Sequence, residues 1–269
     1  MATDPFQDEL AATILVAIVD RGFALAGAYG LNVRGLVDRP THDLDLFTAQ
    51  PNAPTDVLPG LVDTLRAAGY TLDVDTTRIT TGDFARFTAT RGDRAISVDL
   101  ARDWRADTPT VVADIGPVLT AHDLIANKTG ALVERGAPRD YIDTAAALTT
   151  HTREQLMQMV FTRDPGLGVP DFAAAARALD RIPDQEFTDQ GLSPTDTARV
   201  RAAYATWPRD PTHDPAGHAA HTAAHRSATP ADITLTGLPP VTTTPTAAAP
   251  TRAGKHQPPQ PHQPPGRSR

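Results

Sequence analysis

Residues 42–47 read His42-Asp43-Leu44-Asp45-Leu46-Phe47, a run in which two aspartates alternate with apolar residues. Alternation with a period of two is typical of a β-strand with one buried face. On such a strand, the side chains of Asp43 and Asp45 project from the same face, with their Cα atoms about 7 Å apart. Two carboxylates in one space repel each other unless a cation lies between them. The run therefore predicts a Mg²⁺ site, since Mg²⁺ prefers hard oxygen ligands.

A third carboxylate distinguishes this prediction from a solvated edge strand, which would explain an isolated Asp-x-Asp pair equally well. Asp99 lies in the apolar run Ile96-Ser97-Val98-Asp99-Leu100, which predicts a second strand. An acid on a neighbouring strand would complete a two-metal site. Asp103 is the alternative, but it follows the strand where a loop is expected. The predicted metal ligands are Asp43, Asp45 and Asp99.

Two small residues, Gly27 and Ala28, lie between a strand expected at 23–26 and a short helix expected at 31–36. Small side chains let a triphosphate approach the backbone, whose N–H groups bind phosphate oxygens. The pair matches neither a P-loop nor a Gly-x-Gly-x-x-Gly fingerprint, and many such glycines only turn the chain. Gly27 and Ala28 are therefore a candidate nucleotide-binding turn that needs support from other residues.

Lys128 is one of only two lysines in the chain. Leu124, Lys128 and Leu132 recur every four residues, which places the lysine on the apolar side of a predicted helix. A lysine there either extends its ammonium group to solvent or meets an anion in a cleft. The next predicted helix carries Arg139 and Asp143 on one face, which a plain surface ion pair would also explain.

Composition excludes several classes of protein. The chain has 269 residues, 40 % of them apolar and none of them cysteine, which rules out disulfide scaffolds, zinc–thiolate sites and thiol nucleophiles. The apolar run at 14–19 is far shorter than the ~20 residues of a membrane span, and acidic residues precede it. We therefore expect a soluble protein of the cytoplasm. The net charge of −7 implies that a nucleic acid would have to be held by a local patch.

Local signals divide the chain into three parts. Arg91-Gly92-Asp93 predicts a hairpin turn between strands at 84–90 and 95–100. Thr120 and Ser193 begin capping boxes, which predict helix starts. After Trp207 the chain is rich in Pro, Thr, Ala and His without a periodic apolar pattern, which predicts disorder. The expected parts are a sheet domain at 1–120, a helical lobe at 121–207 that completes a cleft, and a disordered tail at 208–269.

Together these segments resemble a known family. The stretches Phe23–Gly30 and Arg39–Leu46 are similar to the first motif of the AbiEii/AbiGii-type nucleotidyltransferase toxins, which belong to toxin–antitoxin systems and are relatives of the MenT toxins. The segment Asp123–Lys128, followed by Arg139-Asp140-Tyr141-Ile142-Asp143, is similar to the family's Lys and Arg-Asp-x-x-Asp motifs. The resemblance covers about residues 5–150, and the order of the motifs makes it specific.

The resemblance implies an α+β fold of the DNA polymerase β type: a small mixed sheet flanked by helices, with a helical C-terminal lobe. It also implies Mg²⁺-dependent transfer of a nucleotide from an NTP. By motif, the two strand aspartates bind metal, the small residues receive the triphosphate, the lysine contacts phosphates, and the last aspartate assists the acceptor. The candidate catalytic residues are Asp43, Asp45, Asp99, Lys128 and Asp143. The candidate nucleotide-binding residues are Gly27, Ala28, Lys128 and Arg139. Ala28 replaces the family's usual glycine or serine.

Three functions remain open at this point. The first is an intracellular toxin that nucleotidylates RNA, with the tRNA 3′ end as the leading acceptor and an antitoxin as its partner. The second keeps the chemistry but transfers the nucleotide to a small molecule or a protein hydroxyl. The third is a non-catalytic member of the fold that binds a partner. The presence of all the carboxylates favours catalysis, whereas the acidic body weakens the RNA interpretation.

Overall fold

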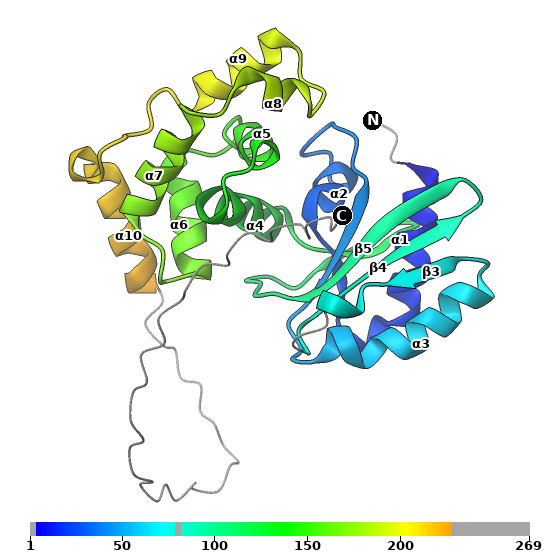
Figure 1. The fold of residues 1–269 in the computed structure, drawn as a ribbon. Coiled ribbons are helices and arrows are strands. Elements are labelled where there is room, and N and C mark those ends of the chain that lie inside the picture. Colours follow the sequence, from blue (N-terminus) through cyan, green and yellow to red (C-terminus); the bar gives the residue numbers. More distant parts are fainter. Residues whose placement is uncertain (1–3, 79–81, 228–269) are drawn as a thin grey trace, which may run out of the picture. The chain divides into compact units, whose positions relative to one another are not determined.

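The computed structural model describes residues 4–78 and 82–227, which belong to one compact unit. Within these residues, seven strands form one mixed sheet in the order β3-β4-β5-β2-β1-β7-β6 (Figure 1). Strand β2 runs parallel to β5 and antiparallel to β1. The strands are β1 (Ala24–Leu25), β2 (Asp43–Thr48), β3 (Thr71–Val74), β4 (Phe84–Arg91), β5 (Arg94–Arg102), β6 (Thr110–Val112) and β7 (Gly116–Val118).

Helices flank the sheet and form the second half of the unit (Figure 1). Their starts follow local chemistry: the side chains of Asp4, Thr120, Thr152 and Ser193 each accept a backbone N–H of the helix that follows. The α-helices of the described residues are α1 (Pro5–Ala17), α2 (Gly27–Val33), α3 (Ala53–Ala67), α4 (Ala121–Glu134), α5 (Pro138–Ala147), α6 (Arg153–Arg163), α7 (Val169–Leu179), α8 (Asp184–Thr188), α9 (Pro194–Ala203) and α10 (Pro215–Ser227).

The two faces of the sheet differ, and this difference positions the aspartates. Leu44 and Leu46 of β2 pack with Val98 and Leu100 of β5 into a core cluster that α1 and α3 complete. Because side chains alternate along a strand, the intervening residues of β2 and β5 face the opposite side. The alternation expected at 42–47 is confirmed, with the leucines buried and the aspartates between them partly buried.

A second core cluster holds the helices together. Tyr141 of α5 lies at its centre, where its hydroxyl donates to the carbonyl of Ala175 at 2.8 Å and its carbonyl accepts the hydroxyl of Tyr204 at 2.8 Å. We call residues 4–119 the sheet lobe and residues 120–227 the helical lobe. The mixed sheet flanked by helices and followed by a helical lobe confirms the expected fold class. The domain boundaries expected from the sequence stay a prediction, because both lobes belong to one compact unit.

Two expectations need correction. Residues 208–227 are not disordered: α10 packs on α6 and buries Ala220 and Ala224, and its small apolar residues gave little periodic signal. The rest of the expected tail, 228–269, lies outside the described residues. The short helix expected at 31–36 is α2, which begins at Gly27 because this glycine adopts a left-handed φ of 59° at the turn from β1. Among the described helices, none combines the length and apolar character that a membrane span requires.

Candidate active site

A cleft of about 1220 Å³ lies between the sheet lobe and the helical lobe. Residues of β2, β5 and the start of α2 line it on one side, and residues of α4, α5, α6 and α9 line it on the other. The cleft brings together seven of the eight residues predicted for the site. These are Gly27, Ala28, Asp43, Asp45, Asp99, Lys128 and Arg139.

Three aspartates lie on two adjacent strands at the sheet side of the cleft. Asp45 of β2 is directly opposite Asp99 of β5 in the parallel register, and Asp43 lies two residues before Asp45 on the same face. Burial, and then the charge of Asp43, raise the pKa of Asp45 to about 6, while Lys128 and Arg139 oppose this shift. Burial is the larger cause of this shift and repulsion by Asp43 the smaller one, and a cation bound beside the carboxylate would offset both.

Besides lying opposite Asp45, Asp99 is bonded to an arginine of the same sheet. Arg86 of β4, its neighbour across the antiparallel ladder, forms two hydrogen bonds with the carboxylate. Arg86 also lines the cleft. The alternative ligand Asp103 lies beyond β5 and pairs with Arg163 of α6 at 2.9 Å, which connects the two lobes. The register therefore favours Asp99 over Asp103 as the third carboxylate.

Gly27 lies directly against Asp45. The N–H of Ala26 donates to the carbonyl of Asp45 at 2.7 Å, which brings the start of α2 onto β2. A Cβ atom added to Gly27 would lie 1.7 Å from Oδ2 of Asp45, where no atom fits. Glycine is thus required here both by its φ of 59° and by the carboxylate. The small-residue turn and the Asp-x-Asp strand, 18 positions apart along the chain, form one structural feature.

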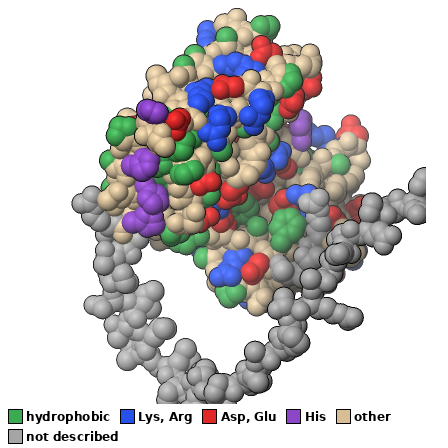
Figure 2. Space-filling model, turned by 60° about the vertical axis from the view of Figure 1, so that its left-hand side comes forward, with side chains coloured by type: hydrophobic (Ala, Val, Ile, Leu, Met, Phe, Trp, Pro, Cys, Tyr) green, Lys and Arg blue, Asp and Glu red, His purple; other side chains and the backbone are tan. Residues whose placement is uncertain are grey.

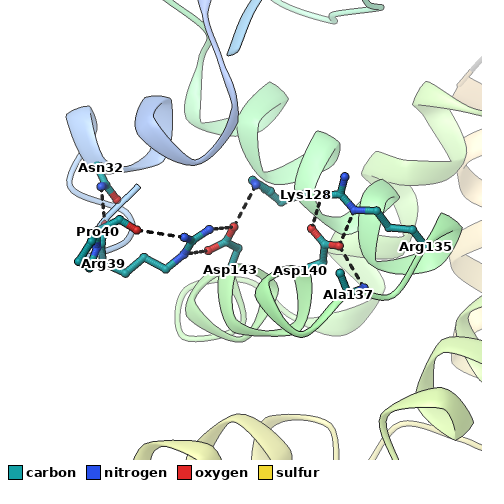
Figure 3. Close-up of polar contacts among 8 residues, drawn as sticks. All are labelled: Asn32, Arg39, Pro40, Lys128, Arg135, Ala137, Asp140 and Asp143. Atoms are coloured by element: carbon teal, nitrogen blue, oxygen red, sulfur yellow. Dashed lines mark hydrogen bonds and ion pairs between the residues drawn. The ribbon is translucent and has the colours of Figure 1, made fainter. Parts of the chain in front are cut away.

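Lys128 does not extend to solvent: its ammonium group pairs with a buried aspartate that does not itself line the cleft. Its Nζ lies 3.1 Å from Oδ2 of Asp143 on α5. Arg39, from the loop between α2 and β2, donates to both oxygens of the same carboxylate at 2.8 and 2.9 Å (Figure 3). Asp143 is fully buried, and the bonds from Arg39 and Lys128 outweigh the effect of burial and lower its pKa. Both oxygens are therefore occupied by cations, which makes Asp143 a poor proton acceptor for the substrate.

A surface ion pair between Arg139 and Asp143 was the alternative explanation of their spacing, but the structure pairs Asp143 with Arg39 and Lys128 instead. The guanidinium of Arg139 is exposed at the cleft and makes no hydrogen bond or ion pair with the part of the chain that the structure describes. Asn127 also lines the cleft. Both polar atoms of its side chain are buried, and they too have no hydrogen-bond partner among the described residues. These two side chains are available for a ligand.

The sequence prediction missed Arg39, Arg86 and Asn127 as parts of the site. Arg39 stands four residues before Asp43, but its partner Asp143 is 104 positions away along the chain. Arg86 pairs with Asp99 across a hairpin, so the expected hairpin at 84–100 was the one available signal. No local pattern marks Asn127, because what distinguishes it is that its buried side chain has no hydrogen-bond partner within residues 4–78 and 82–227.

One further group of potential metal ligands lies outside the cleft. In residues 4–78 and 82–227, only Asp107, His122 and Asp123 bring three ligand atoms within 4.8 Å of one another. The carboxylate of Asp123 already accepts the N–H groups of Ala106 at 2.7 Å and Asp107 at 3.1 Å, so it stabilises the loop that follows β5. This acidic group is able to hold a cation, but it is not the set predicted from the sequence.

A family model described as "Nucleotidyl transferase AbiEii toxin, Type IV TA system" matches residues 10–223. Among solved structures, MenT4, a nucleotidyltransferase toxin from Mycobacterium tuberculosis H37Rv, is similar with a TM-score of 0.53 and 16 % identity, covering 81 % of this chain and 92 % of that one.

JHP933 from Helicobacter pylori is similar with a TM-score of 0.45 and 14 % identity, covering 84 % of this chain and 96 % of that one. A search of curated protein sequences gave no significant match. At these identities, the structural likeness to MenT4 supports the fold alone.

Proposed function

The chain belongs to the AbiEii family of nucleotidyltransferase toxins, and on that premise we propose that it transfers a nucleotide from an NTP to an acceptor hydroxyl with the help of Mg²⁺. The observation that carries this proposal is the pairing of Asp45 with Asp99 in the sheet register, with Asp43 on the same face of the cleft. Three carboxylates on two rigid strands supply the hard oxygen ligands that Mg²⁺ prefers.

The donor set suits Mg²⁺ on electrostatic grounds as well. Burial and the charge of Asp43 raise the pKa of Asp45 to about 6, so this site gains from a bound cation that offsets the repulsion. Asp43, Asp45 and Asp99 would hold Mg²⁺, which would supply positive charge for the phosphates during transfer. Arg86 orients Asp99 through its two hydrogen bonds.

The remaining cleft residues position the nucleotide. Gly27 leaves room for the carboxylate of Asp45, because a side chain at position 27 would overlap it. Gly27 and Ala28 line the cleft beside that carboxylate, where their backbone N–H groups would receive the triphosphate. Lys128 and Arg139, which has no partner among the described residues, supply positive charge for the phosphate oxygens from the opposite side of the cleft. In the reaction, the acceptor oxygen bonds to the α-phosphorus in line with the departing pyrophosphate, and the hydroxyl proton is released.

The acceptor that we favour is RNA, with the tRNA 3′ end as the leading candidate. The cleft of about 1220 Å³ exceeds the 300–1,000 Å³ of a typical small-ligand pocket, which leaves space beside an NTP for the end of a chain. Figure 2 shows Lys and Arg side chains gathered in the upper half of one face, with Asp and Glu among and below them. A polyanion would therefore be held locally, at arginines such as Arg139 and Arg199 that line the cleft. We place this activity in the cytoplasm, under the control of an antitoxin.

A labelling experiment tests the function and separates the alternatives. Each of the four α-labelled NTPs is incubated with the protein, Mg²⁺ and a cell extract, which is then divided into tRNA, protein and small-molecule fractions. Label in tRNA supports the leading proposal, whereas label in another fraction changes the acceptor. Asp43→Asn and Asp45→Asn are the controls, and both are expected to transfer no label. Tight binding of a protein partner without any label transfer would instead indicate a non-catalytic member of the family.

A further inference from the structure

Two aspartates that lie one turn apart on α5, Asp140 and Asp143, each pair with an arginine from outside this helix (Figure 3). Arg39 donates two hydrogen bonds to Asp143, at 2.8 and 2.9 Å. Arg135 donates two hydrogen bonds to Asp140, both at 2.8 Å. Both carboxylates have no exposed surface, so each depends on its arginine for neutralisation. The two carboxylates are equally buried and similarly bonded, but Arg135 is 49 % exposed and Arg39 only 16 %.

The two carboxylates differ in what they bind besides their arginine. Asp140 accepts the backbone N–H of Ala137 at 3.2 Å, which is a helix cap. Asp143 accepts the ammonium group of Lys128, at 3.1 Å, and this lysine lines the cleft opposite the strand aspartates. The carboxylate of Asp143 is therefore shared between a cation of the sheet lobe, Arg39, and a cation of the helical lobe, Lys128.

Sharing creates a conflict when a nucleotide enters. A phosphate contact requires the ammonium of Lys128 to turn from Asp143 toward the cleft, which withdraws one positive charge from a buried carboxylate. An unpaired buried carboxylate is strongly unfavourable. Arg39 already contacts both oxygens of Asp143 and is itself only 16 % exposed, so it maintains the neutralisation after Lys128 has turned away.

We propose that Arg39 is a positioning residue: by neutralising Asp143, it leaves Lys128 free to bind the phosphates of the nucleotide. Asp143 then acts as the resting partner of Lys128 and takes no proton from the acceptor. The loop that carries Arg39 leads into β2 after three residues, and Asn32 fixes it by donating to the carbonyl of Arg39 at 2.7 Å. This inference rests on the proposed function, in which Lys128 contacts the triphosphate.

The test measures nucleotide affinity, which needs no acceptor. Binding of the four Mg·NTPs to the full chain is measured by calorimetry, and the tightest of them is used for the variants. In Arg39→Gln, Lys128 must remain on Asp143, and the dissociation constant is expected to rise about 10–100-fold, the worth of a charge-assisted hydrogen bond. Arg39→Lys keeps the charge and is expected to bind close to the wild type.

Removal of the buried charge provides the decisive comparison. The double variant Arg39→Gln/Asp143→Asn contains no buried anion, so it is expected to recover most of the affinity lost in Arg39→Gln. If Arg39 only fixed its loop through Asp143, the double variant would bind no better than Arg39→Gln, and the proposal would be overturned. Should Arg39→Gln fail to fold, Asp143→Asn is compared with the double variant. The proposal requires these two to agree within about twofold, and a tenfold further loss in the double variant overturns it.

Arg135→Gln is the matched control, because it removes the same type of pair from a buried aspartate that Lys128 does not contact. Its unfolding temperature is expected to fall while nucleotide affinity stays within about twofold of the wild type. An equal loss of affinity in Arg135→Gln and Arg39→Gln would assign both losses to destabilised α5 and would overturn the proposal.

Lys128→Met separates this proposal from the function on which it rests. A wild-type affinity in that variant refutes the phosphate role of Lys128, and the role of Arg39 is overturned with it. If Lys128→Met binds the nucleotide weakly and the double variant Arg39→Gln/Asp143→Asn also stays weak, the role of Arg39 is overturned while the phosphate role of Lys128 stands.

Discussion

Substitution of Gly27 by alanine tests whether the start of α2 and the metal strand act as one feature. The new Cβ would lie 1.7 Å from Oδ2 of Asp45 and 2.6 Å from its Cγ, so the carboxylate must move by more than 1 Å to reach an allowed contact of about 3.0 Å. Misplacement of a reacting group by about 1 Å costs on the order of 100-fold in rate. We therefore expect label transfer by Gly27→Ala to fall about 100-fold.

Gly35→Ala is the matched control for backbone strain. Gly35 has a φ of 67°, close to the 59° of Gly27, but nothing lies within 4 Å of its added Cβ. Backbone strain is expected to cost each variant about 1–2 kcal/mol of stability, because alanine is unfavourable in the left-handed region. Gly27→Ala is expected to lose more, because its new Cβ also overlaps Asp45. Only Gly27→Ala is expected to lose activity as well.

The assay combines two measurements on the wild type and both variants. Initial rates are taken from incorporation of α-label into the accepting fraction, and the rise in unfolding temperature on addition of Mg²⁺ reports the metal site. Gly35→Ala is expected to keep both within about twofold of the wild type. Equal rates and equal Mg²⁺ shifts in the two variants would refute the dependence of Asp45 on Gly27.

Three further predictions follow from individual contacts. The pKa of Asp45, raised to about 6, means that the folded protein keeps a proton that the unfolded chain has released above pH about 4. Without metal, the unfolding temperature of the wild type should therefore fall relative to that of Asp45→Asn as pH rises from about 4 to about 6. Mg²⁺ affinity, measured by calorimetry, should rise about tenfold from pH 5 to pH 7 as the carboxylate ionises. A stability difference and a Mg²⁺ affinity that do not change with pH would contradict both expectations. Asp99→Asn should reduce label transfer by at least about 100-fold, more than changes outside the metal ligands cost, whereas Asp103→Asn should keep most of it, and the reverse order would make Asp103 the ligand. Arg153→Met leaves the buried Asp214 without the guanidinium that contacts it at 2.6 and 2.7 Å, so urea unfolding should show a loss of about 3–5 kcal/mol with transfer unchanged, since neither residue lines the cleft.

Local patterns predicted those parts of the fold whose chemistry is local. The alternation in 42–47 predicts which face of β2 is buried, because the period of a strand is fixed by its backbone. Thr120 and Ser193 mark helix starts for a similar reason, since a cap satisfies N–H groups only two or three residues away. The hairpin between β4 and β5 agrees with its turn residues to within one or two positions at each end.

Features that depend on distant residues were not predicted. Arg39 and Asp143 meet only because the folded chain brings a loop of the sheet lobe onto α5. Spacing alone left an ion pair between Arg139 and Asp143 open, but burial of Asp143 beside Lys128 and Arg39 decided its partners. The helix α10 was missed because it packs through alanines, whose burial contributes less than that of larger side chains and leaves little apolar periodicity.

The most direct test of the central claim compares two labels on the NTP that the protein binds most tightly. With Mg²⁺, α-label should pass to the acceptor and γ-label should leave in pyrophosphate, and Asp45→Asn should abolish both. Chelation of Mg²⁺ should have the same effect as the substitution. Undiminished transfer of α-label by Asp45→Asn, or transfer of γ-label to the acceptor by the wild type, would contradict nucleotidyl transfer at Asp43, Asp45 and Asp99.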